Sequence, residues 1–363
     1  MLAEPHRLEE RLFQLPPVGP DDAWLRVEAC GLCGTDHEQY TGELHGGFAF
    51  VPGHESVGVI DAIGDVAAQR WGIDVGDRVA VEVFQSCGRC EQCRTGTYRR
   101  CERHGIGDMY GFIPAEREPG LWGGYAQYQY LGPDTMPLAV PDGLDPVTAT
   151  LFNPVGAGIR WGATLPETGT GDVVAVMGPG VRGLASAAAA KDSGAGFVMV
   201  TGRGERDHAR LETARAFGAD LVVDIADRDP VDALRRAAGR AADIVVDVTA
   251  KAPAAFAQAM SLARAGGTIV IAGTRGSNET PGFVPDTIVY KELHILGALG
   301  VDTTAYRAAL DLLASRRYPF ADLEHRVVGF DGIDELLATM AGETDAVPPM
   351  HSVFVPDAAD VTP

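Results

Sequence analysis

At 363 residues the chain is too long for one ordinary domain, and we expect two. Hydrophobic residues make up 46% of it and charged residues 22%, which is the composition of a globular protein that can bury real cores. The formal net charge of −20 repels phosphate backbones, so the composition argues against a nucleic-acid partner.

The first residues, MLAEPHRLEERLFQLPP, lack the apolar core of a signal peptide. No run approaches the ~18 apolar residues that a membrane-spanning helix needs. We therefore expect a cytoplasmic protein with no membrane partner. In that compartment the six cysteines are expected to be metal ligands or reactive thiols rather than disulfides.

Short valine-rich runs broken by glycine fill residues 1–150. The segments AWLRVEACG, SVGVIDAIG and DRVAVEV have the composition of strands separated by turns. Few long helical periods interrupt them. This part of the chain is therefore predicted to be a twisted all-β domain.

Residues 151–300 have a different sequence pattern, in which apolar strands alternate with alanine- and leucine-rich helices. The expected strands read DVVAVMG, FVMVTG, LVVDI, DIVVDVT and GTIVIAG. Strands that are almost wholly apolar imply a parallel sheet covered by helices on both faces. Residues 301–363 add helical pieces, TTAYRAALDLLASRR and GIDELLATMAG, and an extended end, MHSVFVPD.

A glycine-rich loop follows the first of these parallel strands. Residues 178–183 read GPGVRG, a G-x-G-x-x-G between a strand and a helix, which is the context of a dinucleotide site. The glycines permit a tight turn and a close approach to the pyrophosphate at the helix N-terminus. The residues predicted to contact the cofactor are Gly178, Gly180, Val181, Gly183, Gly202, Arg203, Thr249 and Gly273.

The end of the second parallel strand should distinguish NAD from NADP. An NAD site usually places an acidic residue there to hold the ribose 2′-hydroxyl. This sequence has Gly202 and Arg203 at that place, with Arg206 nearby, which favours the 2′-phosphate of NADP. Glu205 and Asp207 follow in a lengthened loop, so NAD stays open as the alternative.

Four cysteines, Cys87, Cys90, Cys93 and Cys101, have the spacing C-x2-C-x2-C-x7-C. Four thiolates can close a tetrahedral zinc site. An iron–sulfur run would end in C-x3-C-P, and Glu102 stands here in place of the proline. Disulfides are the remaining alternative. Since sulfur fills all four positions, the spacing predicts a structural zinc rather than a catalytic one.

The other two cysteines, Cys30 and Cys33, form a C-x-x-C in EACGLCGTDHEQYTG. As a redox motif this pair should open a helix in a βαβ unit, and it lies instead in the β-rich part. His54 and Glu55 follow in VPGHESVG. A cysteine, a histidine and a carboxylate are ligands that leave zinc a fourth, open position.

These motifs together resemble those of the zinc-dependent medium-chain dehydrogenase/reductase family, which includes alcohol, sorbitol, threonine and glucose dehydrogenases. The resemblance covers essentially the whole chain: CGTD at 33–36, GHE at 53–55, GDRVAVE at 76–82, the four-cysteine lobe, the glycine loop, and GGTIVIAG at 266–273. It implies a GroES-like β domain (1–150), a Rossmann domain (151–300) and a tail (301–363) that returns to the first domain. It also places the active site between the two domains.

The resemblance assigns the metal ligands residue by residue. Cys33 and His54 match ligands of the family's catalytic zinc, and Glu55 matches the acid beside it, which binds metal directly in the sorbitol-type branch. A further ligand of relatives falls on Asn153, whose amide oxygen is a weak zinc ligand. Either Glu55 completes the site, or Asn153 only holds a water there. A degenerate site without catalysis is the third alternative.

The family's proton relay is only partly matched. Thr35 corresponds to the hydroxyl that passes the alcohol proton outward, and Asp36 to the acid that orients the zinc histidine. Relatives often have a relay histidine where this chain has Glu38, and here the histidine comes one residue earlier, at His37. The order GTDHE looks like the glucose dehydrogenase branch.

The activity that the resemblance implies is reversible hydride transfer between an alcohol and NAD(P). The substrate is expected to be a small secondary alcohol, polyol or sugar, and the chain to carry two zinc ions, one catalytic and one structural. A glucose or aldose dehydrogenase and a non-catalytic NAD(P)-binding member are the alternatives. Relatives are dimers or tetramers, so a homodimer or homotetramer is expected.

Overall fold

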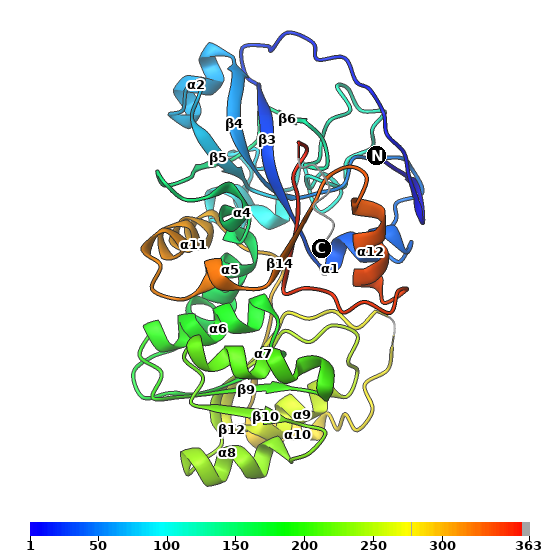
Figure 1. The fold of residues 1–363 in the computed structure, drawn as a ribbon. Coiled ribbons are helices and arrows are strands. Elements are labelled where there is room, and N and C mark those ends of the chain that lie inside the picture. Colours follow the sequence, from blue (N-terminus) through cyan, green and yellow to red (C-terminus); the bar gives the residue numbers. More distant parts are fainter. Residues whose placement is uncertain (277, 358–363) are drawn as a thin grey trace. The chain divides into compact units, whose positions relative to one another are not determined.

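The structure, a computed structural model, describes residues 1–276 and 278–357 (Figure 1). The chain divides into two compact units. The first unit comprises Met1–Asn153, Asp302–Arg316 and the chain from Phe320 on, and the second comprises Pro154–Val301 with Arg317–Pro319. Among the described residues, no helix is long and apolar enough to cross a membrane.

The first unit is built on a seven-stranded sheet of order β14-β15-β3-β4-β5-β7, with β6 also paired to β3. The strands are β3 (Ala23–Leu32), β4 (Glu55–Ile63), β5 (Arg78–Val81), β6 (Tyr128–Leu131), β7 (Pro137–Ala139), β14 (His325–Val328) and β15 (His351–Phe354). Only β14 and β15 pair in parallel; the other pairs are antiparallel. The last strand of the described residues, β15, thus pairs with β3 near the start of the chain, in register Phe354↔Cys30.

Short helices and turns surround this sheet. They are α1 (Gly34–Tyr40), α2 (Asp65–Trp71), α3 (Glu91–Arg94), α4 (Pro146–Ala149), α11 (Thr303–Ser315) and α12 (Ile333–Ala341), with 3-10 turns at Tyr98–Arg100 and Phe320–Asp322. A two-stranded ribbon of β1 (Leu2–Glu4) and β2 (Arg7–Leu8) stands apart from the sheet. The apolar residues of β3, β4 and β5 pack with Tyr110, Ile113 and Trp122 into one of this unit's cores.

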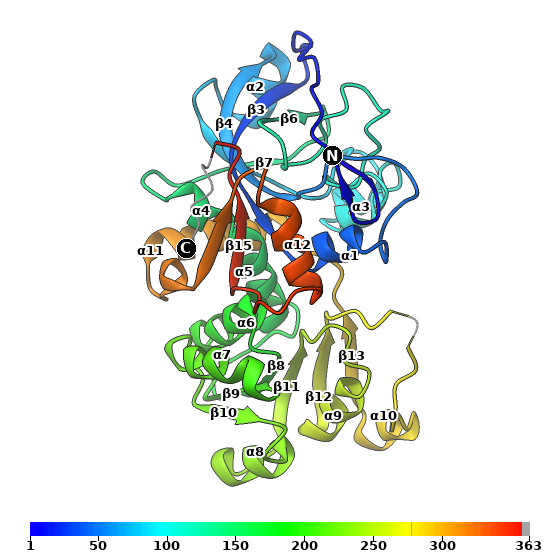
Figure 2. The same cartoon turned by 45° about the vertical axis from the view of Figure 1, so that its right-hand side comes forward.

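The second unit is a six-stranded parallel sheet of order β10-β9-β8-β11-β12-β13 (Figure 2). Its strands are β8 (Val173–Met177), β9 (Phe197–Gly202), β10 (Leu221–Asp224), β11 (Ala242–Asp247), β12 (Ala263–Ile271) and β13 (His294–Gly297). Its helices are α6 (Val181–Asp192), α7 (Glu205–Ala216), α8 (Pro230–Ala238), α9 (Ala255–Leu262) and α10 (Asp286–Lys291). Helix α5 (Phe152–Ile159) and a π-helical turn at Arg160–Thr164 precede the first strand.

Local sequence explains these elements. Every residue of β8 and β11 is buried, which is what a parallel sheet with helices on both faces requires. Helix α8 shows the expected start and stop signals: the Asp229 side chain accepts the N–H of Val231 at 2.7 Å, Pro230 opens the helix, and Gly239 ends it at φ 74°. The strand order reverses between β8 and β11, and such a point is where open α/β sheets bind ligands. The predicted fold class, a β domain combined with a Rossmann domain, is confirmed.

A buried carboxylate joins three segments of the first unit. Glu82, directly after β5, is 0% exposed and accepts a hydrogen bond from the Tyr98 hydroxyl at 2.7 Å. The same hydroxyl accepts the backbone N–H of Thr303, the first residue of α11, at 2.6 Å. Burial raises the pKa of Glu82 from 4.5 to about 8.

This raised pKa makes stability depend on pH in a definite direction. Between about pH 4.5 and 8 the unfolded chain releases the Glu82 proton while the folded chain retains it, so this residue's contribution to stability falls as pH rises through that window. Glu82→Gln removes the effect. In thermal melts from pH 5 to 8.5, the melting temperature of the variant should rise relative to that of the parent protein as the pH increases. Parallel curves for the two proteins would contradict the assignment, and the exposed Glu116→Gln controls for loss of one formal charge.

Candidate active site

The junction of β3 and α1 positions the first of the predicted metal ligands. Cys33 is the N-cap residue of α1, with extended backbone angles (φ −130°, ψ −174°). Asp36, in the first turn, accepts the backbone N–H of Cys33 on Oδ2 at 2.7 Å. This capping contact fixes the backbone of Cys33 at the start of the helix.

The start of β4 brings two more ligands to the same place. Cys33 Sγ lies 3.3 Å from Nε2 of His54, and Glu55 is the first residue of β4. One ligand atom from each of Cys33, His54 and Glu55 lies within 4.8 Å of the others. His54 and Glu55 are buried, so a thiol, an imidazole and a carboxylate converge in a site where their polar atoms need a partner.

The surroundings of His54 fit a metal ion on its Nε2. His54 Nδ1 and Asp36 Oδ1 are buried, and neither has a hydrogen-bond partner within the described part of the chain. These two atoms lie 3.9 Å apart. With Nε2 turned to Cys33 and Nδ1 turned to Asp36, the ring has the orientation of a metal-bound histidine that is held by a carboxylate. A donor set of sulfur, nitrogen and oxygen suits zinc.

The remaining predicted residues near this site are placed as follows. Thr35 and His37 lie in α1, and both are partly exposed. A Cβ built on Gly34 would stand 3.9 Å from Nε2 of His37, so that ring folds back toward the start of the helix. Asn153 is buried and donates from Nδ2 to the hydroxyl of Tyr306 in α11 at 3.0 Å.

The four remaining predicted ligands form a second group. The Sγ atoms of Cys87, Cys90, Cys93 and Cys101 lie within 4.8 Å of one another, and all six cysteines of the chain are free of disulfides. Cys90 caps α3 and accepts the backbone N–H of Cys93 at 3.4 Å. Backbone N–H groups of Arg89 and Cys90 lower the pKa of Cys87 to about 6, which favours the thiolate that a metal requires.

Cys30, by contrast, is a buried thiol that lies outside both groups of predicted ligands. Its Sγ lies 3.6 Å from the Ser56 hydroxyl and 3.6 Å from the Gly31 carbonyl oxygen, and it is fully buried. Burial, together with the charge of Asp36, raises its pKa well above the usual value. A buried thiol of raised pKa argues against the redox interpretation of the Cys30/Cys33 pair.

The glycine loop of the second unit has the geometry that its sequence predicts. β8 ends at Met177, Gly178 has φ 107°, and α6 begins at Val181 with Gly180 as its N-cap. A Cβ on Gly183 would stand 1.9 Å from the carbonyl oxygen of Gly178, so only glycine fits there. The N–H groups of a twelve-residue helix thus open toward a loop that a pyrophosphate can approach.

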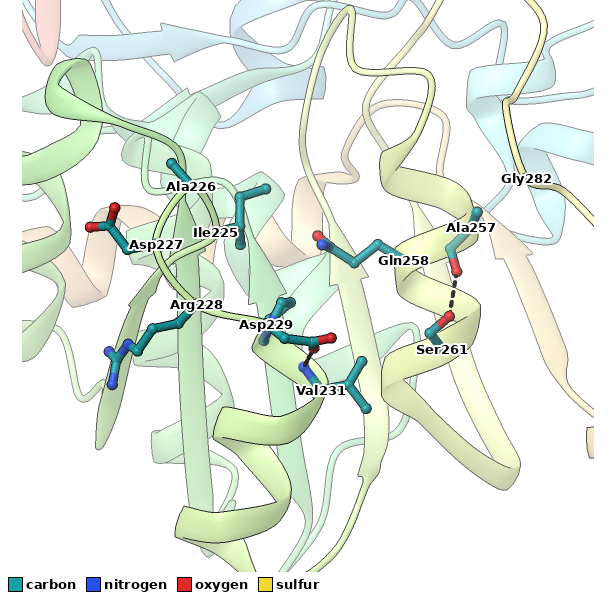
Figure 3. A pocket seen from close by; sticks show the side chains of 11 residues that line it. Ile225, Ala226, Asp227, Arg228, Asp229, Val231, Ala257, Gln258, Ser261 and Gly282 are labelled. Carbon is teal, nitrogen blue, oxygen red and sulfur yellow. Dashed lines mark hydrogen bonds between the residues drawn. The ribbon is translucent and has the colours of Figure 1, made fainter.

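The other predicted cofactor residues lie at the carboxyl ends of the strands. A Cβ on Gly273 would stand 1.9 Å from the carbonyl oxygen of Thr249, so these two segments are in close contact. Gly202 is the last residue of β9, and Arg203 follows it, exposed. A hollow of about 540 Å³ lies between the loop that leads into α8 (lining residues 225–231) and α9 (Figure 3). Gln258 points from α9 toward that loop, and Ile225 in the loop donates its N–H to the carbonyl oxygen of Gly202 at 2.9 Å.

Comparison with known protein families gives two matches. Residues 19–142 match the family model of the alcohol dehydrogenase GroES-like domain, and residues 182–315 match that of the zinc-binding dehydrogenases.

Individual relatives agree with these families. The chain is 68% identical over 357 residues to a Mycobacterium tuberculosis protein named "Probable alcohol dehydrogenase adh", covering 98% of this chain and 97% of that one. It is 34% identical over 306 residues to the sorbitol dehydrogenase of Bacillus subtilis, covering 83% and 81%. Among solved structures, a zinc-binding dehydrogenase from Sinorhizobium meliloti bound to NADP superposes with a TM-score of 0.80 at 28% identity, covering 94% of each chain.

The family and the class of enzyme predicted from the motifs are therefore confirmed. A match to both family models, and a relative of 68% identity along nearly the whole chain, show both. The chain belongs to the zinc-dependent medium-chain dehydrogenase/reductase family, as an NAD(P)-dependent enzyme of the alcohol dehydrogenase type.

Proposed function

We propose that this chain interconverts alcohols and carbonyl compounds, with Cys33, His54 and Glu55 holding a catalytic zinc ion. The observation that carries the proposal is the convergence of these three side chains, whose ligand atoms lie within 4.8 Å of one another. A zinc ion held by these residues would polarise the substrate oxygen as a Lewis acid, and NAD(P) would supply or accept the hydride. The substrate class is a small secondary alcohol, polyol or sugar, and the similarity to a sorbitol dehydrogenase supports a polyol.

Asp36 holds two of the ligands at once. Its Oδ2 accepts the N–H of Cys33 at 2.7 Å, and its Oδ1 faces Nδ1 of His54 at 3.9 Å. A carboxylate in that place keeps the proton of a neutral imidazole on Nδ1 and leaves Nε2 as the ligand atom. The geometry of the site therefore depends on one buried acid that faces two of the proposed ligands.

Glu55 is the better candidate for the third ligand than Asn153. The structure makes room for its carboxylate by leaving residue 31 without a side chain: a Cβ on Gly31 would stand 2.5 Å from Oε2 of Glu55. Asn153 is bonded to Tyr306 through its amide nitrogen, and the amide oxygen that remains is neutral and a weaker zinc ligand than a carboxylate. We assign Asn153 to orienting groups at the site rather than to binding the metal. Sequence reasoning missed Gly31, although a glycine inside the strand run EACGL is a signal of a close approach.

Thr35 and His37 are the proposed path for the proton. The hydroxyl of Thr35 accepts the alcohol proton while it donates its own proton toward the cofactor ribose. His37, two residues further along α1, is the group proposed to pass the proton from there toward solvent. The partial exposure of both residues is consistent with that route. Glu38 stands where relatives often have the relay histidine, so the ring that folds back toward Gly34 is the histidine available to this chain.

The four-cysteine group is proposed to bind a second, structural zinc. Sulfur would occupy every position of a tetrahedral site, which leaves none for a substrate. Two zinc ions per chain, a homodimer or homotetramer, and a cytoplasmic location remain predictions of the sequence. A glucose or aldose dehydrogenase stays the alternative within the same chemistry.

The Cys33→Ser variant tests the catalytic assignment. Without one of its three ligands the site loses Lewis-acid assistance worth several kcal/mol, so turnover of alcohols should fall on the order of 10³-fold or more. Zinc content should fall from two ions to one per chain, while binding of the reduced cofactor stays within about 2-fold, since the glycine loop is untouched. Cys30→Ser is the matched control and should keep both zinc ions. A fully active Cys33→Ser enzyme would remove Cys33 from the mechanism.

The Gly31→Ala variant tests the role of Glu55. The added methyl group displaces the Glu55 carboxylate without requiring unusual backbone angles, so the protein should still fold. If Glu55 binds the metal, the affinity of this site for zinc should fall about 10- to 100-fold in titrations against a chromophoric chelator, with the four-cysteine site unchanged. Gly107→Ala adds a methyl group in open space and serves as the control. Unchanged zinc affinity in Gly31→Ala would take Glu55 out of the ligand set.

A further inference from the structure

We propose that Asp207, in the first turn of α7, makes this enzyme select NAD over NADP by accepting the 2′-hydroxyl of the adenosine ribose. This inference rests on the proposed function, because it assumes that the dinucleotide binds at the glycine loop. It assigns the acidic role to a residue outside β9, whose last residue, Gly202, has no side chain to offer.

The Asp207 side chain occupies the space beside the end of β9. A Cβ built on Gly202 would stand 2.9 Å from Cβ of Asp207, 3.2 Å from its Oδ2 and 3.0 Å from Cγ of Pro179. The carboxylate of Asp207 and the glycine loop therefore both lie beside the end of β9. An acidic residue at position 202 would have to place its own side chain where that of Asp207 lies.

A tight turn holds the carboxylate there. Oδ2 of Asp207 accepts the backbone N–H of Arg203 at 2.9 Å, and the backbone N–H of Asp207 donates to the carbonyl oxygen of Gly204 at 3.0 Å. Gly204 has φ 70°, a conformation that lets the chain reverse between β9 and α7. Its N–H in turn donates to Oδ1 of Asp224, at the end of β10, at 2.9 Å. The position of Asp207 is thus set by two neighbouring strand ends.

This arrangement suits a ribose hydroxyl and opposes a phosphate. The bond to Arg203 uses one oxygen of Asp207, and a carboxylate has a second oxygen that can accept a hydroxyl proton. A 2′-phosphate carries a charge of about −1.5 to −2 and would meet a carboxylate at close range. It would also find the N–H of Arg203, a natural donor to a phosphate oxygen, already bonded to Asp207.

The arginines of the loop do not make it basic. Arg203 and Arg206 are exposed, and the same short segment carries Glu205, Asp207 and, from the next strand, Asp224. Two positive charges are set against three negative ones. The preference for NADP that the arginines indicate in the sequence is therefore reversed in this proposal.

Fluorescence titration of the zinc-loaded enzyme with NADH and with NADPH tests the inference directly. The parent protein should bind NADH at least 10-fold more tightly than NADPH. In Asp207→Asn the loss of a charge-assisted hydrogen bond should weaken NADH about 10- to 100-fold, while NADPH tightens as the repulsion disappears. Opposite changes in the affinities for NADH and NADPH would indicate recognition of the ribose. A general loosening of the loop would instead weaken the binding of both cofactors.

Two further proteins complete the test. Glu205→Gln removes a neighbouring acid from the same helical turn and should leave the NADH/NADPH ratio within about 2-fold of the parent. Asp207→Glu keeps the carboxylate and should keep the preference for NADH. A parent enzyme that prefers NADPH, or an Asp207→Asn variant with an unchanged ratio, overturns the inference alone. Failure of the parent to bind either dinucleotide overturns the proposed function and the inference with it.

Discussion

The candidate zinc site depends on one buried carboxylate, that of Asp36. It is 2% exposed, receives the backbone N–H of Cys33 and faces Nδ1 of His54. These two contacts tie the end of β3 to the residue that precedes β4, two strands that pair along most of their length. A buried acid is costly unless its polar atoms are paired, and here the neighbours of Asp36 are two of the proposed zinc ligands. Stability and ligand geometry are therefore provided by the same group.

Absent side chains matter as much as present ones. Gly31 leaves the space that the Glu55 carboxylate occupies, Gly183 allows α6 to start directly over the Gly178 carbonyl, and Gly202 leaves the space taken by Asp207. In each case the nearest atom to an added Cβ lies 1.9–2.9 Å away, closer than real contacts allow. Neither the proposed metal site nor the cofactor loop could form in its present shape if these positions carried side chains.

The sequence predicts what depends on spacing and periodicity. The change from valine-rich strands to alternating strands and helices marks the change of architecture, and the four-cysteine spacing predicts a group whose sulfur atoms do converge. It fails where the decisive contact joins distant residues. Nothing in the segment around Asn153 reveals that Tyr306, 153 residues later, takes its amide nitrogen. Likewise, no local pattern shows that the strand ending in Phe354 pairs with β3.

The loop after β9 shows why a residue's role cannot be taken from its number alone. Counted along the chain, the position that should carry an acid has a glycine followed by an arginine, and the sequence then favours a phosphate. In the folded chain, however, the turn at Gly204 brings Asp207 back against Gly202. The Cβ of Asp207 lies 2.9 Å from the position that a Cβ on Gly202 would take. The usual sequence rule for NAD recognition looks for the acidic residue at the end of the second strand itself. In the proposed arrangement the ribose hydroxyl depends on where the carboxylate lies. Two hydrogen bonds, from the N–H of Arg203 to Asp207 and from the N–H of Gly204 to Asp224, hold that carboxylate at the start of the neighbouring helix.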